Sequence, residues 1–318
     1  MNPLPPLRAM EVFEAVGHCG GITQAARRLG ISTGAVSQQM KILEQALGIS
    51  LMVKAGQRLR LNPSGQRFHA RCTAAFEALR LAVDEAHRSR DPHSLSISGL
   101  PSLLHKWLGP LIGEWEQHNP TVSVYLDSSL NEDLTLEGVD FRIGYGDSLQ
   151  EGEHGLELFQ DCVVPVCAPP LIAAGGPFAS AEPLARLPLI RVDSRPKFDS
   201  PPSWESWFAT AQVVLAQPLH IPRTFSSTGM AIEAALLGQG VVLAPYSMVG
   251  KELGSGRLVI AVLHPSLLPS PYQLRWASEA FHKPQCRSFQ RWLVARGRAQ
   301  QALTQALLAS VAAGAVVT

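Results

Sequence analysis

Residues 22–43 constrain the fold of this 318-residue chain more than any other segment. Their sequence, ITQAARRLGISTGAVSQQMKIL, predicts two short helices joined by a turn at Gly30, which is the form of a helix-turn-helix. Ala26 is small enough for the second helix to cross close above it, and Gly30 supplies the left-handed conformation that the turn needs. Thr23 and Ser32 are the predicted N-caps of the first and second helices. The segment therefore predicts a DNA-binding domain.

The second helix of this motif has two chemically different faces. Apolar residues recur at spacings of four, three and four and form one buried stripe: Val36, Met40, Leu43 and Leu47. The outward face carries short polar side chains, an amide and an ammonium: Thr33, Ser37, Gln38 and Lys41. Such side chains suit base edges in the major groove, whereas a face that serves only solubility is usually rich in Glu and Lys. We predict that these four residues, with Thr23 and Ser32, contact DNA; an ordinary solvated helix face is the alternative.

The distribution of charge supports this interpretation. The whole chain has 27 basic and 26 acidic side chains, and its net charge of +1 indicates no partner. Residues 1–90 hold 12 basic and 6 acidic side chains, a net charge of +6, so the remaining residues, with 15 basic and 20 acidic side chains, carry −5. A basic amino-terminal third joined to an acidic remainder indicates that only the amino-terminal end faces DNA phosphates.

Residues 51–62, LMVKAGQRLRLN, alternate apolar and polar side chains around Ala55-Gly56, which predicts a β-hairpin. Beside a helix-turn-helix, this hairpin would be the wing of a winged helix. Lys54 and Arg58 are predicted to project from its tip and to reach the phosphate backbone or the adjacent minor groove. A solvated basic turn is the alternative.

A single long helix is predicted from Pro63 to about Arg90, because Pro suits the first helical position and neither Gly nor Pro occurs between Gly65 and Arg90. Apolar residues follow a four-three spacing along it, widened at two positions: Phe68, Cys72, Ala75, Leu79 and Ala82, with Phe76 and Val83. A small domain cannot bury the whole of such a stripe, so we predict that the helix pairs with a second copy of the chain. Packing of the stripe on the carboxy-terminal domain is the alternative.

At this point the chain resembles the LysR-type transcriptional regulators, and most closely their glycine-cleavage activator branch. The resemblance runs through both halves of the chain and is carried by PPLRAMEVFEAV (5–16), residues 22–51, LNPSGQRF (61–68), GLPSLLHKWLGPLI (99–112), VVPVCAPPLI (163–172) and GMAIEAALLGQGVVLAP (229–245). The chain departs from the family pattern in the second helix and in the wing. In the helix, Thr33 stands where Gln or a similar residue is usual, and Gly34 stands where Pro or Ala is usual. In the wing, Leu51-Met52-Val53-Lys54 replaces Leu-Phe-x-Arg, which keeps a positive charge but loses bidentate geometry.

Asp91-Pro92 is predicted to end the long helix and to open an α/β region. Short β-rich runs alternate there with helical ones, at 94–99, 102–118, 122–127, 140–146, 162–168, 187–192, 204–208, 228–237 and 241–245. About 225 residues is large for one sheet, so two linked subdomains fit better. The resemblance implies a periplasmic-binding-protein-like arrangement with a ligand in the cleft between the subdomains. The predicted domains are 1–63 (winged helix-turn-helix), 64–91 (linker helix) and 92–318 (effector-binding domain), the last split into about 92–163 with 268–302 and about 164–267.

Small hydroxyl side chains stand at several predicted corners between strand and helix: Pro101-Ser102, Ser128-Ser129 and Ser226-Ser227-Thr228. Helix N-termini with free N–H groups and hydroxyls form a natural seat for a carboxylate, although each Ser on its own is more often a plain N-cap. The resemblance places the effector site at Ser102, Ser129 and Thr228, with Phe198 lining the cleft. We therefore predict a small organic acid or amino-acid-like effector, bound by Pro101, Ser102, Ser128, Ser129, Phe198, Ser227 and Thr228. The resemblance also implies that cleft closure changes the geometry of a homotetramer on DNA.

The sequence supports an enzyme less well than a DNA-binding regulator. It contains no nucleophile elbow, P-loop or dinucleotide fingerprint, and its ten His are not spaced as metal ligands usually are. We expect no catalytic residue, metal or cofactor. The five Cys include no Cys-x-x-Cys pair, and Cys162 and Cys167 would lie on opposite faces of one strand. A redox-sensing regulator that uses these cysteines remains an alternative, as does a solute-binding receptor.

The two ends of the chain give further expectations. Pro3, Pro5 and Pro6 interrupt the apolar run that a signal peptide needs, so we expect a cytoplasmic protein rather than a secreted receptor. The tail, residues 303–318, is apolar but too short to span a bilayer. It is either a packed last helix or a frayed end, and no membrane partner is expected.

Overall fold

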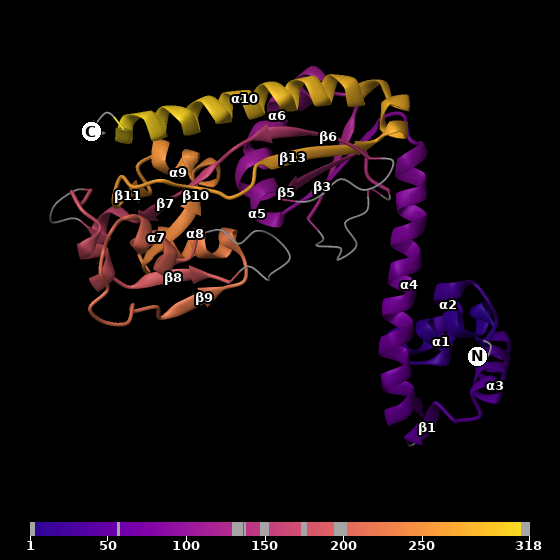
Figure 1. The fold of residues 1–318 in the computed structure, drawn as a ribbon. Coiled ribbons are helices and arrows are strands. Elements are labelled where there is room, and N and C mark those ends of the chain that lie inside the picture. The colour runs from indigo at the N-terminus through magenta and orange to yellow at the C-terminus, as the bar shows by residue number, and fades with distance from the viewer. Residues whose placement is uncertain are drawn as a thin grey trace. The chain divides into compact units, whose positions relative to one another are not determined.

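The computed structural model describes residues 4–55, 58–128, 136, 138–146, 153–172, 177–193 and 202–312. The chain forms two compact units, Met1–His87 and Arg88–Thr318 (Figure 1). Each unit has its own hydrophobic core. The units are described separately below.

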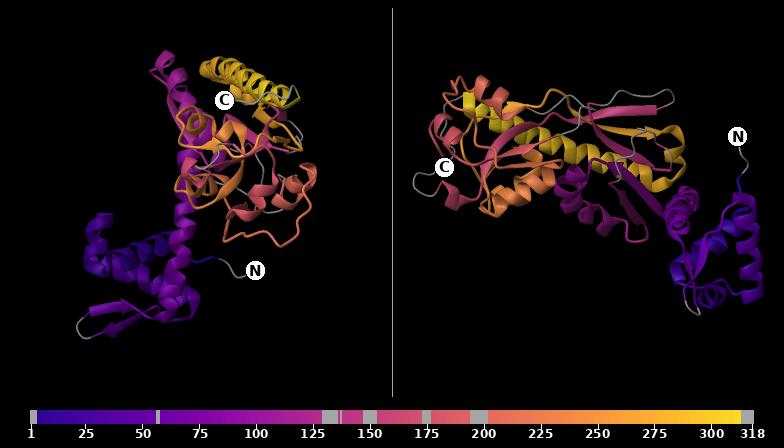
Figure 2. Two further views of the ribbon diagram at one scale, coloured as in Figure 1. Left: turned by 90° about the vertical axis from the view of Figure 1, so that its left-hand side faces the viewer. Right: turned by 90° about the horizontal axis from the view of Figure 1, so that it is seen from below.

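The first unit contains three short helices, a hairpin and most of a long helix. In chain order these are α1 (Leu7–Cys19), α2 (Ile22–Leu29), α3 (Thr33–Leu47), β1 (Met52–Ala55), β2 (Arg58–Leu61) and α4 (Pro63–Arg90). The strands pair antiparallel, with Met52 opposite Leu61 and Ala55 opposite Arg58. Figure 2 shows the hairpin extending away from the three helices. The predicted winged helix-turn-helix and the predicted span of the long helix are confirmed.

The turn between α2 and α3 forms as its residues predict. Gly30 has φ +66°, and Ser32 caps α3 by accepting a hydrogen bond from the Ala35 backbone N–H at 3.1 Å. The predicted N-cap at Thr23 is wrong. The N-cap position of α2 is Gly21, and no side chain caps this helix, so Thr23 lies within its first turn. An extended Gly21 ahead of Ile22 starts the helix two residues earlier than an N-cap at Thr23 would.

The apolar stripe of α4 is divided between two environments. Phe68, Cys72 and Phe76 pack against the core of the first unit. Leu79 and Val83, farther along the helix, are 50% and 55% exposed. The first unit therefore covers only the beginning of the stripe.

The second unit contains two sheets. The first sheet has the strand order β4-β3-β5-β13-β6 and is built from β3 (Ser94–Gly99), β4 (Ser123–Asp127), β5 (Phe141–Tyr145), β6 (Glu153–Phe159) and β13 (Tyr272–Ala277). The second sheet has the order β11-β7-β10-β8-β9, with β12 also paired to β7; its strands are β7 (Cys162–Cys167), β8 (Leu189–Val192), β9 (Arg223–Phe225), β10 (Val241–Pro245), β11 (Val259–Ile260) and β12 (Ser266–Leu267). β3 is parallel to β4 and β5, and β8 is parallel to β9 and β10. The chain crosses between the sheets after β6 and returns before β13.

Helices flank both sheets. They are α5 (Pro101–Leu103), α6 (Gly109–His118), α7 (Trp204–Thr210), α8 (Thr228–Leu236), α9 (Gly250–Gly254) and α10 (Pro284–Ala312). Shorter 3-10 helices cover Pro169–Leu171, Glu182–Arg186, Tyr246–Met248 and Ser278–His282. α5 continues into α6 through one π-helical stretch, Leu104–Leu108, so the predicted helix over 102–118 is confirmed.

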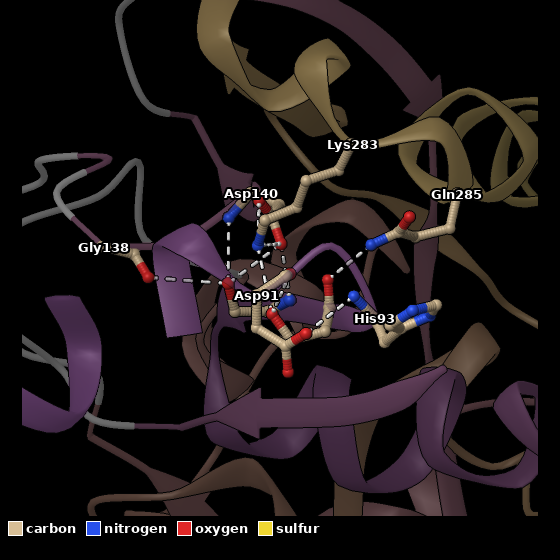
Figure 3. Close-up of polar contacts among 8 residues, drawn as sticks. Asp91, His93, Gly138, Asp140, Lys283 and Gln285 are labelled. Atoms are coloured by element: carbon tan, nitrogen blue, oxygen red, sulfur yellow. Dashed lines mark hydrogen bonds and ion pairs between the residues drawn. The ribbon is translucent and has the colours of Figure 1, made fainter. Parts of the chain in front are cut away.

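A buried polar cluster ties the start of β3 to the strand and helix around it (Figure 3). The Asp140 carboxylate accepts hydrogen bonds from the Ser96 backbone N–H at 2.8 Å and from the Ser96 hydroxyl at 3.1 Å. Lys283 Nζ lies 3.0 Å from Asp140 Oδ1 and donates to the Ser94 hydroxyl at 3.2 Å. Gln285 Nε2 donates to the Ser94 carbonyl at 2.7 Å. The Lys283 ammonium is thus the charge partner of a buried carboxylate.

Candidate DNA-binding surface and effector cleft

The predicted reading face of α3 is fixed by the residues on its opposite side. Val36, Met40 and Leu43 are buried in the core of the first unit. Gln38 and Lys41 are exposed, as is Thr33 at the first position of α3. The buried stripe sets the rotation of α3 about its axis and leaves these polar side chains free for an external partner.

Ser37 differs from the rest of this face. It is half-buried, and its hydroxyl donates to the Thr33 carbonyl one turn earlier at 2.9 Å. The sequence pattern predicts that this side chain points straight outward. It points back along its own helix instead. Its oxygen lone pairs remain able to accept a hydrogen bond.

The base of the wing is held by two polar side chains. Glu44 on α3 accepts hydrogen bonds from the backbone N–H groups of Leu51 at 2.7 Å and Met52 at 3.3 Å. Asn62 donates to the Ser50 carbonyl at 2.7 Å and caps α4 by accepting from the Gly65 N–H at 2.8 Å. These bonds join α3, the hairpin and α4 into one frame. The side chains of Lys54 and Arg58 lie outside the described residues.

A cavity of about 350 Å³ opens at the carboxyl ends of β8 and β10 in the second sheet. Its polar lining includes Arg191, Asp193, Glu205 and Thr228, and Trp204 contributes an aromatic wall. The Arg191 guanidinium forms an ion pair with Glu205. Of the predicted effector residues, the cavity includes Thr228, the first residue of α8.

Ser102 connects the two sides of the second unit, one built around the first sheet and the other around the second sheet. Its hydroxyl oxygen accepts a hydrogen bond from the Gly229 N–H in the first turn of α8 at 2.9 Å and lies 3.2 Å from the Ser227 hydroxyl. Ser227 is the N-cap residue of α8 but makes no side-chain cap of its own. Ser102 follows Pro101 on α5, which comes directly after β3 of the first sheet, so a hydroxyl next to the first sheet caps a helix beside the second.

Lys106 forms a second connection between the two sides. It lies in the π-helical stretch, where its Nζ is 2.6 Å from Glu233 Oε1 of α8 and 3.4 Å from Glu252 Oε1 of α9. The Lys106 and Glu252 side chains are buried, and Arg257 also pairs with Glu252 at 3.3 Å. π-helical turns occur often at functional sites. Here the turn places Lys106 against two carboxylates.

The remaining predicted effector residues have different outcomes. Ser128 directly follows β4 and is exposed. Ser129 and Phe198 lie outside the described residues. Four residues of the cavity lining were not among the predicted effector residues: Arg191, Asp193, Trp204 and Glu205. The signal for Arg191 and Asp193 was available, since both stand at the end of a predicted strand, where ligands of parallel sheets bind.

Cys162 and Cys167 lie on β7, and both are buried free thiols. Burial raises the pKa of the Cys162 thiol to about 12 and that of Cys167 to about 11. Because the thiolate is the reactive form, these shifts disfavour redox sensing by either residue. Within the described ranges, no three or more His, Cys, Asp and Glu side chains gather as metal ligands would, and no helix is long and apolar enough to cross a membrane.

Comparison with known proteins assigns a family to each of the two units. Residues 7–66 match the bacterial regulatory helix-turn-helix protein family of lysR type, and residues 88–298 match the LysR substrate binding domain. The chain belongs to the LysR family. It is therefore a DNA-binding transcriptional regulator with an effector-binding domain, in a family of regulators rather than enzymes.

Relatives of this LysR-family regulator are similar over nearly their full lengths. The glycine cleavage system transcriptional activator of Escherichia coli K12 is 29% identical over 301 residues, covering 94% of this chain and 96% of its own. The transcriptional regulator TrpI of Pseudomonas aeruginosa is 31% identical over 298 residues, covering 91% and 97%.

Two solved structures share the fold. Full-length HypT from Salmonella typhimurium has a TM-score of 0.57 at 20% identity, covering 93% of this chain and 99% of that one. The AmpR effector binding domain from Citrobacter freundii has a TM-score of 0.52 at 25% identity, covering 65% and 98%.

Proposed function

We propose that α3 reads base edges in the major groove through Thr33, Ser37, Gln38 and Lys41, while Thr23 and Ser32 contact the backbone beside it. Lys54 and Arg58 of the wing would contact phosphates or the minor groove. The observation that carries this proposal is the polar face of α3, which the buried stripe and the Ser32 cap hold in a fixed orientation.

Gln38→Ala is expected to weaken binding to a specific operator by roughly 1–3 kcal/mol, because an amide that pairs with adenine is lost. Nonspecific binding should be almost unchanged. Fluorescence anisotropy measures both, on duplex from the upstream intergenic region and on a scrambled duplex, at about 150 mM salt. Gln45→Ala is the matched control, since Gln45 is an exposed amide at the far end of the same helix. Equal losses on both duplexes would remove Gln38 from base reading.

The effector is proposed to be a small organic acid or an amino-acid-like molecule. It would bind in the cleft near Thr228, with Pro101, Ser102, Ser128, Ser129, Phe198 and Ser227 as further candidate contacts. The support is a cavity at the ends of the parallel strands β8 and β10, beside the N-terminus of α8. Arg191 and Asp193 supply both signs of charge there.

A bound effector is expected to raise the melting temperature by several degrees at about a hundredfold excess over its Kd, because it stabilises only the folded state. A panel of small carboxylic and amino acids, screened by scanning fluorimetry, tests this. Thr228→Val should reduce the rise, whereas Thr224→Val, an exposed Thr on β9, should retain it. A flat response across the panel would contradict this effector class.

A cytoplasmic homodimer through α4, assembling to a tetramer, completes the proposal. Its support is the uncovered half of the apolar stripe, where Leu79 and Val83 remain exposed in the isolated chain. Effector binding would then alter the spacing of the DNA-binding units in the assembly. Sedimentation of the full chain tests the assembly, since a monomer at micromolar concentration would contradict it.

A further inference from the structure

The hinge of the second unit consists of the two segments in which the chain crosses between the sheets: Gln160-Asp161, and residues 268–271. The crossings are hydrogen-bonded to each other. The Leu268 N–H donates to the Asp161 carbonyl at 3.0 Å, and Gln160 Nε2 donates to the Leu268 carbonyl at 2.5 Å. Any change in the angle between the sheets must act on these few residues.

The last thirteen residues of α10, 300–312, are here named the strap and pass over this hinge. α10 begins beside the first sheet, contacts β6, and continues to the side of the second sheet, where Figure 1 shows its end near α9. Gln301 Oε1 accepts a hydrogen bond from the Gln160 backbone N–H at 2.6 Å. Leu307 is buried in the core that both sheets share. Residues 303–312 of the strap belong to the apolar tail, for which the sequence suggested no role.

Asp161 is the central contact of the strap and is 0% exposed. Its carboxylate accepts hydrogen bonds from the Cys162 N–H at 2.8 Å, from the Ser247 N–H at 3.1 Å and from the Thr304 hydroxyl at 3.4 Å. These donors come from β7, from the 3-10 helix Tyr246–Met248 and from α10, so one carboxylate joins the second sheet to the strap. Among the ion pairs of the described residues, none involves Asp161.

We propose that the strap clamps the hinge through Asp161 and Gln160 and thereby restrains the opening of the effector cleft. A helix is stiff, and this one packs on both sides of the hinge, so rotating the sheets apart must detach the strap from Asp161 or from β6. This restraint acts in the protein without a bound effector, and it does not depend on which effector the cleft binds.

Hydrogen exchange in the full chain tests the proposal at a site on the cleft rather than on the strap. The Gly229 N–H donates to Ser102 across the cleft, so its exchange reports cleft opening. Thr304→Val keeps the shape of the side chain and removes its hydroxyl. It is expected to speed exchange at Gly229 by about three- to tenfold. Ser310→Ala is the matched control on the same helix, because the Ser310 hydroxyl bonds only to the Leu307 carbonyl of α10 in the contacts described.

The hinge should also respond to pH, because burial raises the pKa of the Asp161 carboxyl to about 6. The raised value means that the closed hinge favours the protonated acid, so closure is strongest at low pH and weakens as pH rises through about 6. Among the residues that the structure describes, the titratable groups that face Asp161 are Cys162, Tyr246 and Tyr272. Burial raises the pKa of all three, so they remain neutral from pH 5 to 7. Gln301 and Thr304 of the strap carry no charge.

When the pH is lowered from 7 to 5, the protection factor of the Gly229 N–H in the wild type should increase about tenfold, after correction for intrinsic exchange. Asp161→Asn should abolish this increase. If that variant does not fold, Thr304→Val decides the question alone. Faster exchange confined to α10 and the crossings, or none at all, would overturn the proposal, because the strap would then be packing without control of the cleft.

Discussion

Lys283→Met is expected to destabilise the second unit by about 3–5 kcal/mol, the usual cost of leaving a buried carboxylate without its cation. The Lys283 ammonium lies 3.0 Å from Asp140, and both side chains are buried (Figure 3). The Met side chain fills similar volume but carries no charge, so the change isolates the electrostatic contribution. Among the residues that the structure describes, Asp140 would then keep its bonds from Ser96 alone.

Denaturant unfolding followed by tryptophan fluorescence measures this loss, because all six Trp lie in the second unit. Lys251→Met is the matched control, since Lys251 is exposed on α9. Adding Asp140→Asn to Lys283→Met should recover part of the stability, because no charge then remains buried without a partner. If Lys283→Met unfolds like Lys251→Met, Asp140 does not depend on this ammonium.

Features set by neighbours in sequence could be predicted in detail. The turn at Gly30, the cap at Ser32 and the start of α4 at Pro63 each depend on the conformational preference of one or two residues. Thr23 shows the limit of such preferences: a good capping residue does not cap when an extended Gly21 and Ile22 start the helix before it.

Features that depend on distant residues are not contained in any local pattern. β13 lies between β5 and β6, so its environment is set by residues more than a hundred positions earlier in the chain, and it was the predicted domain split, not a local pattern, that grouped residues 268–302 with residues 92–163. Ser102 could be identified as a corner hydroxyl, but its bond to Gly229 spans 127 positions and no local pattern contains it. For the same reason α10 was not predicted as a helix that reaches the hinge: Thr304 meets Asp161 only after both sheets have formed.

Gly65→Ala is expected to destabilise the first unit by roughly 2–3 kcal/mol and to impair DNA binding. A Cβ at Gly65 would lie 2.2 Å from the Leu51 carbonyl oxygen, a backbone atom that no rotamer change can move. α4 and the base of the wing must therefore separate, which strains the bonds from Asn62 to Ser50 and to Leu51. Overpacking costs about 1–3 kcal/mol or more, which exceeds the gain of at most about 1 kcal/mol from replacing a helical Gly.

Gly34→Ala distinguishes this steric effect from the general effect of removing a glycine. At Gly34 on α3 the nearest atom to a new Cβ is the Ser32 hydroxyl oxygen at 3.8 Å, an ordinary contact, so a gain of about 0.5 kcal/mol is expected. Unfolding of the first unit is followed by hydrogen exchange, while tryptophan fluorescence should show the second unit unchanged. Opposite signs for the two variants would locate the cost at the contact between α4 and the wing. A stabilised Gly65→Ala would show that the wing can move away from α4 freely and that Asn62 does not hold it for DNA binding.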